Sequence, residues 1–389
     1  MKILLGLSGG VDSAIAAYLL KEQGYDVTCC FMRNWDAYAN NDIAGNPTIL
    51  DDTCPQEQDY MDALAVAKHL DLELLRVDFI KEYWDYVFKT FLSEYEKGRT
   101  PNPDILCNKY IKFDSFFHYA LDHGFDVVAT GHYASTTKIE GFNYLTRALD
   151  KNKDQTYFLC QVSSDAIQKT MFPLGNLTKP EVRKYAADLN LESVATKKDS
   201  TGICFIGERD FRKFLTNYLP SKDGDIVDID TGEVVGRHIG VLYYTIGQRK
   251  GLNIDHKVGP WFVVGKDVKE NILFVCHHTH QEWLQSDSCL VKDVNWLIPE
   301  SYPLPKRCTA KFRYRQPDQK IRLKKLDDTT VLLTYPQKIS SVTCGQEAVF
   351  YDGQVCMGGG VIEEVYIGKD DLNQKIIEAY KEKKKDGKA

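Results

Sequence analysis

A serine- and glycine-rich segment near the N-terminus has the residue types of an anion-binding site. A short apolar run ends in Ser8-Gly9-Gly10-Val11-Asp12-Ser13, and an amphipathic helix pattern follows at once. The first N–H groups of a helix lack partners within it and the helix dipole is positive there, so this junction is suited to phosphate. Glycines let the backbone come close to the anion, and serine hydroxyls can donate to its oxygens. The segment predicts a phosphate loop, and the alternative is a strand-to-helix turn that binds nothing.

The spacing of this loop distinguishes it from two other phosphate loops. No Gly-Lys-Ser/Thr follows as in a Walker A loop, and the GxGxxG pattern of dinucleotide sites is absent. The segment resembles the SGGxDS pyrophosphate loop of the ATP pyrophosphatases. Those enzymes split ATP into AMP and pyrophosphate, so the resemblance implies ATP as a substrate.

Two of the eleven cysteines lie in settings unlike those of the others. Cys107 follows residues 100–104, which contain two prolines, and precedes a predicted helix whose dipole would stabilise a thiolate. Cys204 lies in a glycine-flanked loop, residues 199–207, where two domains are expected to meet and a thiol could swing. For either cysteine, a structural role is the alternative. We interpret the other nine as core or incidental residues: Cys29, Cys30, Cys54, Cys160, Cys276, Cys289, Cys308, Cys344 and Cys356.

The segment Cys276-His-His-Thr-His280 offers four potential metal ligands in five residues. Neighbouring residues on a strand point to opposite faces, so at most two of these side chains could reach one metal without a turn. No second ligand pair follows at zinc-finger spacing. We therefore predict no metal site formed by the protein, and a structural metal is the less favoured alternative.

The elements that must position these residues alternate between strand and helix up to about residue 205. The alternation predicts a doubly wound parallel sheet, an α/β fold. Ligands of such sheets bind outside the carboxyl ends of the strands, where the phosphate loop and residues 131–133 both lie. Beyond the first strand we expect strands at 26–31, 73–78 and 126–130, and helices at 14–20, 56–70, 83–95, 109–123 and 180–189.

After a helix near 210–218, the pattern changes to short strands separated by turn signals, which indicates small β units. Between Pro305 and Lys325 lie nine lysines and arginines against one acid, Asp318, in a chain of net charge −6. This basic stretch predicts a nucleic-acid surface, or alternatively a solvated strand face. We expect a catalytic domain at 1–207, a small β-rich domain at 208–283, a β-barrel at 284–366 and a charged tail at 367–389.

Length and composition bound the class of protein. A chain of 389 residues is too long for one core, and 43% hydrophobic with 27% charged residues is ordinary for a soluble globular protein. No apolar run approaches the roughly 20 residues that span a bilayer. The sequence enters a strand at once, without a signal peptide. We therefore expect a cytoplasmic protein with reduced cysteines and no membrane partner.

Further motifs make the resemblance specific. They share one order along the chain: Phe31-Met-Arg-Asn-Trp-Asp36, Pro101-Asn-Pro-Asp-Ile-Leu-Cys107-Asn-Lys, Thr130-Gly-His-Tyr133, Asp150-Lys-Asn-Lys-Asp-Gln-Thr-Tyr-Phe-Leu159, Ser200-Thr-Gly-Ile-Cys204-Phe-Ile-Gly, Tyr244-Thr-Ile-Gly-Gln-Arg249-Lys-Gly and Lys311-Phe-Arg-Tyr-Arg-Gln316. From about residue 1 to 365, the chain closely resembles the bacterial tRNA-specific 2-thiouridylases. The fold implied is an adenine nucleotide α-hydrolase-like domain followed by the two β domains.

The resemblance implies a reaction on the wobble uridine, U34, of tRNA. ATP, with Mg²⁺ on its phosphates, adenylates the C2 carbonyl oxygen and releases pyrophosphate. Cys204 is implied to carry sulfur as a persulfide received from a cysteine desulfurase or a sulfur-relay protein, and Cys107 to act as the nucleophile. Sulfur transfer to C2 then expels AMP, gives 2-thiouridine and leaves a Cys107–Cys204 disulfide to be reduced.

The same resemblance assigns binding roles residue by residue. The implied ATP contacts are Gly6, Leu7, Ser8, Gly9, Gly10, Val11, Asp12, Ser13, Met32 and Gly131. The implied contacts with the flipped-out target base are Asn102, Pro103 and Asp104. The implied tRNA contacts are His132, Lys153, Asp154, Gln155, Arg313, Tyr314 and Gln346.

Two other classes of protein compete with this interpretation. Another adenylating pyrophosphatase, such as a synthetase amidating a small metabolite or a tRNA lysidine-forming enzyme, needs no cysteine pair. The settings of Cys107 and Cys204 therefore count against it. A non-catalytic RNA-binding protein on the same scaffold would show no tRNA-dependent exchange of pyrophosphate with ATP.

Overall fold

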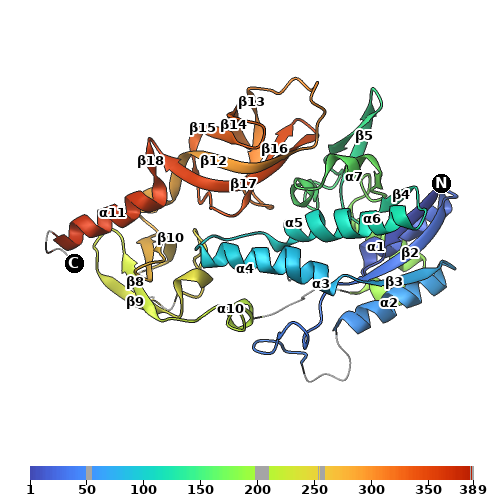
Figure 1. The fold of residues 1–389 in the computed structure, drawn as a ribbon, viewed down its shortest axis with the longest axis horizontal. Coiled ribbons are helices and arrows are strands. Elements are labelled where there is room, and N and C mark those ends of the chain that lie inside the picture. The colour runs from blue at the N-terminus through green and yellow to red at the C-terminus, as the bar shows by residue number, and fades with distance from the viewer. Residues whose placement is uncertain (50–54, 198–209, 253, 255–258, 386, 388–389) are drawn as a thin grey trace.

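The structure of the chain is a computed structural model (Figure 1), which describes residues 1–49, 55–197, 210–252, 254, 259–385 and 387. Cys54 and Cys204 lie outside the described residues, as does the whole 199–207 loop, so their predicted roles stay predictions. The N-terminal half, in blue to green in Figure 1, holds the α/β sheet, and the C-terminal half is mostly strands.

The N-terminal sheet has five parallel strands in the order β3-β2-β1-β4-β7, which confirms the predicted doubly wound fold. The chain builds outward from β1 in one direction and then returns to the other side of β1 with β4. The carboxyl ends of β1 and β4 therefore flank the switch point at which such folds bind ligands. The strands are β1 (Lys2–Gly6), β2 (Asp26–Arg33), β3 (Leu74–Asp78), β4 (Val127–Ala129) and β7 (Thr170–Met171).

Both faces of this sheet are buried. Ile3 and Leu5 of β1 pack with the helices on one face, whereas Leu4 packs into a second cluster on the other. Alternate strand residues point to opposite faces, so a continuous apolar run is what a strand covered on both sides requires. The helices of the first face are α1 (Val11–Glu22), α2 (Pro55–His69), α8 (Lys179–Asp188) and α9 (Glu192–Ala195).

The second face is covered by a long helical region between β3 and β4. The predicted helix at 109–123 begins earlier, at Pro103, and both helical stretches contain π-helical turns. In the second of these turns Phe113 has φ −118° and ψ 16°, which breaks the regular helix. The segments are α3 (Ile80–Glu82), η1 (Tyr83–Phe88), α4 (Lys89–Glu96), α5 (Pro103–Cys107), η2 (Asn108–Ser115) and α6 (Phe116–Asp122).

The middle of the chain forms a four-stranded sheet in the order β10-β11-β8-β9. A short helix, α10 (Phe211–Leu215), precedes it, and Phe214 packs into the same cluster as Trp35 and Phe88 of the N-terminal half. The strands are β8 (Gly224–Asp228), β9 (Val234–His238), β10 (Trp261–Asp267) and β11 (Ile272–His277).

The C-terminal strands close into a barrel, because β12 pairs with both β15 and β17. An N-terminal hairpin, β5 (Ser135–Ile139) and β6 (Phe142–Thr146), joins this sheet through the pair Val355↔Thr146. The sequence did not reveal this connection, and the predicted domain limits stay predictions. The barrel strands are β12 (Gln285–Trp296), β13 (Arg307–Lys311), β14 (Gln319–Lys325), β15 (Val331–Ser340), β16 (Glu347–Asp352) and β17 (Val355–Ile367).

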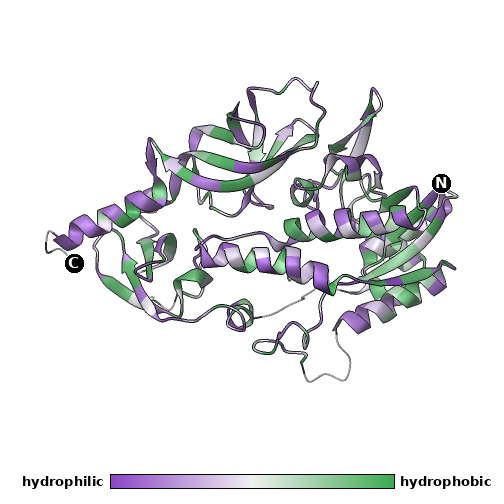
Figure 2. Ribbon diagram, in the orientation of Figure 1, coloured by the Kyte–Doolittle hydropathy of each residue, from purple (hydrophilic) through white to green (hydrophobic). Residues whose placement is uncertain are grey.

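The charged C-terminal segment forms α11 (Leu372–Lys385), which packs against the protein rather than standing free as a solvated tail. Leu372 and Ile376 are buried, and the Asn373 side chain exchanges hydrogen bonds with the Lys266 backbone of β10. Figure 2 shows hydrophobic and hydrophilic residues alternating along this helix. Its apolar side therefore docks, while most of its lysines are exposed and Lys383 donates to the Asp230 carbonyl at 2.8 Å.

Candidate functional site

A cavity of about 1440 Å³ lies at the carboxyl ends of β1 and β4 and extends to the barrel. Most of the residues predicted to bind ATP, the target base or tRNA line this one cavity. They are Gly6, Leu7, Ser8, Gly9, Gly10, Val11, Asp12, Ser13, Met32, Asp104, Gly131, His132, Lys153, Asp154, Gln155 and Tyr314.

The phosphate loop is held open by hydrogen bonds within it. The Ser8 N–H donates to Ser13 Oγ at 3.1 Å, and Ser13 Oγ donates to the Gly10 carbonyl at 3.0 Å. Gly9 has φ +73°, and a Cβ there would lie 2.2 Å from the carbonyl oxygen of Asp59, so only glycine fits. A Cβ on Gly10 would meet nothing closer than Ser8 Oγ at 3.5 Å. The space beside Gly10 belongs to the cavity.

The loop after β4 packs directly on the start of α1. A Cβ on Gly131 would lie 2.7 Å from the Ser13 backbone nitrogen, which explains a glycine at this position. Tyr133 Oη donates to Asp12 Oδ1 at 2.8 Å, and Lys179 Nζ donates to both Asp12 carboxyl oxygens at 2.8 Å. The one acid of the phosphate loop is thus offset by a lysine, so its charge does not repel an incoming anion.

The segment before Cys107 is a capped helix start. Asn102 Oδ1 accepts hydrogen bonds from the backbone N–H groups of Asp104 at 3.1 Å and Ile105 at 3.3 Å, and Pro103 occupies the first helical position. Cys107 consequently lies in the second turn and is fully buried. The prediction that Cys107 sits at the helix N-terminus is wrong, because the helix begins at Pro103. Asp104, about one turn earlier, lines the cavity.

The other described cysteines behave as the sequence interpretation expects. Burial raises the pKa of seven of these thiols to about 12 and that of Cys160 well above its usual value. They are therefore protonated at neutral pH and are poor nucleophiles. The seven are Cys29, Cys30, Cys276, Cys289, Cys308, Cys344 and Cys356.

Three of the predicted tRNA contacts have internal partners. Burial, with the nearby charge of Lys112, holds the pKa of His132 well below its usual value, so its ring is neutral. Asp154 is buried and accepts a hydrogen bond from the Ala148 N–H at 3.2 Å. Gln155 Oε1 accepts one from the Tyr133 N–H at 2.8 Å. These residues shape the cavity wall, and their contact with tRNA stays a prediction.

Arg313, Tyr314 and Gln346 connect the barrel to the rest of the molecule. Arg313 donates to the Ile246 carbonyl at 2.7 Å and to Thr343 Oγ1 at 2.8 Å, and burial lowers its pKa. The Tyr314 ring centroid lies 4.3 Å from that of Phe158. Gln346 Nε2 donates to the Thr100 carbonyl at 2.6 Å.

Comparison with known proteins agrees with this architecture. Three family models match in order: tRNA methyl transferase HUP domain over residues 1–208, tRNA methyl transferase PRC-barrel domain over 212–277, and aminomethyltransferase beta-barrel domain over 286–362. The tRNA-specific 2-thiouridylase MnmA of Mycoplasma mycoides subsp. mycoides is 56% identical over 371 residues, covering 94% of this chain and 99% of that protein. The chain belongs to the tRNA-specific 2-thiouridylase family.

A second relative of the same name supports this membership. The tRNA-specific 2-thiouridylase MnmA of Mesoplasma florum is 54% identical over 371 residues, covering 94% of this chain and 99% of that protein. Among solved structures, an NMN synthetase from Francisella tularensis is 19% identical and covers 54% of this chain and 70% of that one. Its TM-score is 0.30, so this similarity indicates nothing about the function of the chain.

The cavity of this 2-thiouridylase family member also contains further charged residues. Lys311 and Arg315 belong to the basic stretch that the sequence indicates as a nucleic-acid surface, whereas others were missed. Asp59, Lys112 and Lys197 come from separate elements that only the fold brings to the loop, and no local pattern marks them. Asn102, Pro103, Cys107, Arg313 and Gln346 do not line the cavity.

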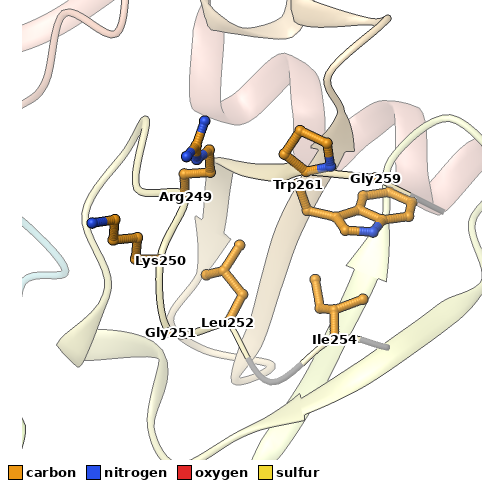
Figure 3. Close-up of a pocket in the computed structure, with 8 residues that line it drawn as sticks. Arg249, Lys250, Gly251, Leu252, Ile254, Gly259 and Trp261 are labelled. Carbon is orange, nitrogen blue, oxygen red and sulfur yellow. The ribbon is translucent and has the colours of Figure 1, made fainter. Parts of the chain in front are cut away.

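A second cavity of about 500 Å³ lies in the middle unit (Figure 3) and holds none of the predicted site residues. Arg249 and Lys250 of the 244–251 motif lie on its rim, opposite the Trp261 indole.

The 276–280 segment gives its histidines separate partners. His278 Nδ1 lies 3.0 Å from His277 Nε2, whereas His280 Nδ1 lies 2.9 Å from Asp230 Oδ2. Within the described ranges, no three His, Cys, Asp or Glu side chains gather as metal ligands do.

None of the helices in the described part of the chain has the length and apolar character needed to cross a bilayer.

Proposed function

We propose that this chain is an ATP-dependent tRNA-uridine 2-sulfurtransferase that converts the wobble uridine, U34, to 2-thiouridine, releasing AMP and pyrophosphate. The observation that carries the proposal is one cavity lined by the SGGxDS loop, by Asp104 and by Lys311 and Arg315 of the barrel. A nucleotide, a target base and an RNA backbone can therefore meet in it. The named relatives, which match 94% of the chain, support the same activity.

The first step uses the phosphate loop. The first residues of α1 and Ser8 line the cavity, where backbone N–H groups of the helix start and the Ser8 hydroxyl suit the phosphates of ATP, while the Ser13 hydroxyl is used inside the loop by the Gly10 carbonyl. The C2 carbonyl oxygen of U34 attacks the α-phosphorus, the bond to the β-phosphate oxygen breaks, and pyrophosphate leaves. Adenylation turns a poor leaving group, the carbonyl oxygen, into AMP, a good one.

Mg²⁺ is expected to arrive on the phosphates of ATP rather than in a cage made by the protein. The carboxylates beside the loop already accept hydrogen bonds from lysines: Asp12 from Lys179 and Asp59 from Lys197. This donor set does not fit a separate magnesium site. When bound with ATP, Mg²⁺ would neutralise the phosphate charge.

The second step transfers sulfur. A cysteine desulfurase or a sulfur-relay protein supplies a persulfide to Cys204, and its terminal sulfur bonds to C2 while the C2–O bond breaks and AMP leaves. The Cys107 thiolate attacks Cys204 Sγ, so the S–S bond breaks, the sulfur stays on C2 and a Cys107–Cys204 disulfide forms. A thiol reductant then restores both cysteines, as the cytoplasm, the proposed compartment, permits.

Because Cys107 is buried, side chains around the helix start must move before its thiol can reach the sulfur linkage between Cys204 and U34. Asp104 lines the cavity about one helical turn from Cys107, so we expect U34 to approach along this wall.

Depletion of this protein in its own cells tests the proposal. Mass spectrometry of tRNA nucleosides should show loss of 2-thiouridine derivatives with other modified nucleosides unchanged. Unchanged 2-thiouridine after depletion would overturn the proposal. Loss of lysidine instead would favour the tRNA lysidine-forming rival.

A further inference from the structure

Lys197 ties the phosphate loop to the neighbouring helix. Its Nζ donates to the Gly9 carbonyl at 3.2 Å, to Asp59 Oδ1 at 2.6 Å and to Asp62 Oδ2 at 2.7 Å. Both aspartates belong to α2. Arg183 of α8 holds the backbone of this lysine, donating to the Lys197 carbonyl at 3.2 Å. The Lys197 side chain therefore joins the loop after β1 to α2, and its backbone carbonyl is held by α8.

The contact with Gly9 sets the direction of a peptide plane. The Gly9 carbonyl and the Gly10 N–H belong to one planar trans peptide and point in opposite directions. With the carbonyl held toward the Lys197 ammonium group, the Gly10 N–H is directed away from that group, and Gly10 itself lines the cavity. Gly9, at φ +73°, has a flexible backbone and needs an outside restraint to keep this orientation.

We propose that Lys197 is a positioning residue for ATP: it fixes the Gly9–Gly10 peptide so that the loop N–H groups converge on the phosphates. This inference rests on the proposed ATP-dependent function. Lys197 acts through the Gly9 carbonyl, and the charge of its ammonium group is offset by Asp59 and Asp62. Burial lowers the pKa of Lys197, but the hydrogen bonds and the negative charges of Asp59 and Asp62 together raise it above its usual value, so the lysine is charged at neutral pH.

A different role for Lys197, as a cation that touches the phosphates directly, predicts the opposite effect of one substitution. Asp62→Ala removes a negative charge near the loop and frees the ammonium group. Direct phosphate contact would then tighten ATP binding. Positioning predicts weaker binding, because the lysine loses an anchor and the Gly9 carbonyl is held less firmly. Alanine is a good helix former, so α2 tolerates the change.

The experiment measures KM for ATP and kcat in tRNA-dependent pyrophosphate release. For Asp62→Ala we expect the KM for ATP to rise about fivefold with kcat changed less. For Lys197→Met we expect a rise of about tenfold or more. An unchanged or lower KM in Asp62→Ala would overturn the proposal.

The matched control is Asp188→Ala. Asp188 pairs with Lys184 at 2.6 Å on the exposed side of α8, close to the 2.7 Å of the Lys197–Asp62 pair, but both side chains of the control pair are far more exposed to solvent. Its loss should leave the KM for ATP unchanged. The wild-type protein separates the two claims. Absence of tRNA-dependent pyrophosphate release in the wild type would contradict the proposed function. Normal wild-type activity with an unchanged or lower KM for ATP in Asp62→Ala would contradict only the role of Lys197.

Discussion

Gly9 and Gly10 are adjacent but constrained for different reasons. Gly9 lies at φ +73° with the Asp59 carbonyl where a Cβ would stand, so its requirement is structural. Gly10 has φ −106° and ψ 161°, a conformation open to any residue, and the space beside it is part of the cavity. Under the proposed function its requirement is functional, because a side chain there would occupy the expected place of a phosphate.

Gly10→Val should abolish tRNA-dependent pyrophosphate release and leave the thermal midpoint near that of the wild type. Gly9→Ala should instead lower stability by at least about 2 kcal/mol, because of the left-handed backbone and the clash. Calorimetry and pyrophosphate release on both variants provide the check. Wild-type release by Gly10→Val would remove this loop from the ATP site.

Lys266 in β10 is a buried residue whose charge affects stability. Its Nζ donates to the Gly98 carbonyl at 2.9 Å, just after α4, and burial lowers its pKa from 10.5 to about 7. The unfolded chain therefore binds more protons than the folded one between these values. By linkage, this lysine makes the free energy of unfolding rise with pH from about 7 to 10.5.

Lys266→Met should remove that rise. Relative to the wild type, the variant should lose stability progressively as pH increases from 7 to 10, because only the wild type gains from deprotonation of the unfolded chain. Urea unfolding of both proteins across this range measures the difference. A difference independent of pH would show that Lys266 does not titrate with a lowered pKa.

At the scale of elements, the barrel segment 311–316 holds two kinds of arginine. Arg313 is half-buried and donates to the Ile246 carbonyl and to Thr343, so it joins the barrel to the middle unit. Arg315 is exposed and lines the cavity. Charge reversal at both positions, which the sequence alone suggests as one test of tRNA binding, would therefore combine two separate effects.

Arg315→Glu should weaken tRNA binding and reduce the salt dependence of log Kd by about one unit of slope, since one phosphate contact is lost. Its thermal midpoint should not change. Arg313→Glu should lower the midpoint, because a buried donor is replaced by an acid without partners. Equal losses of stability in both variants would contradict this division of roles.

Local sequence signals were sufficient for some elements and were overlooked for others. Asn102 followed by Pro103 is a normal helix-capping signature, yet the predicted helix began at 109, because the setting of Cys107 was interpreted as a helix start. The strands β1 to β4 were predictable, since their apolar runs need only local pattern recognition. The pairing of β5 and β6 with the barrel was not, because it joins residues far apart in the sequence.

At the scale of the whole molecule, the cavity exists because distant segments pack together. Arg147 follows the β5–β6 hairpin and pairs with Asp318 of the barrel at 2.6 Å, and its guanidinium lies 3.6 Å from the Tyr351 ring centroid. Predicted site residues such as Asp12 and Tyr314 are more than 300 positions apart in the sequence, yet both line one space. Resemblance could assign them roles, but only the fold shows which of them share a cavity.

The proposed ATP-dependent sulfur transfer uses two cysteines with separate tasks. The most direct measurement follows radiolabelled sulfur on protein and on tRNA, with purified protein, ATP, tRNA and a cysteine desulfurase system, and with free sulfide excluded. Wild type should label both. Cys204→Ser should label neither, and Cys107→Ser should carry label on protein without passing it to tRNA. Thiolated tRNA made by Cys204→Ser under these conditions would contradict the account.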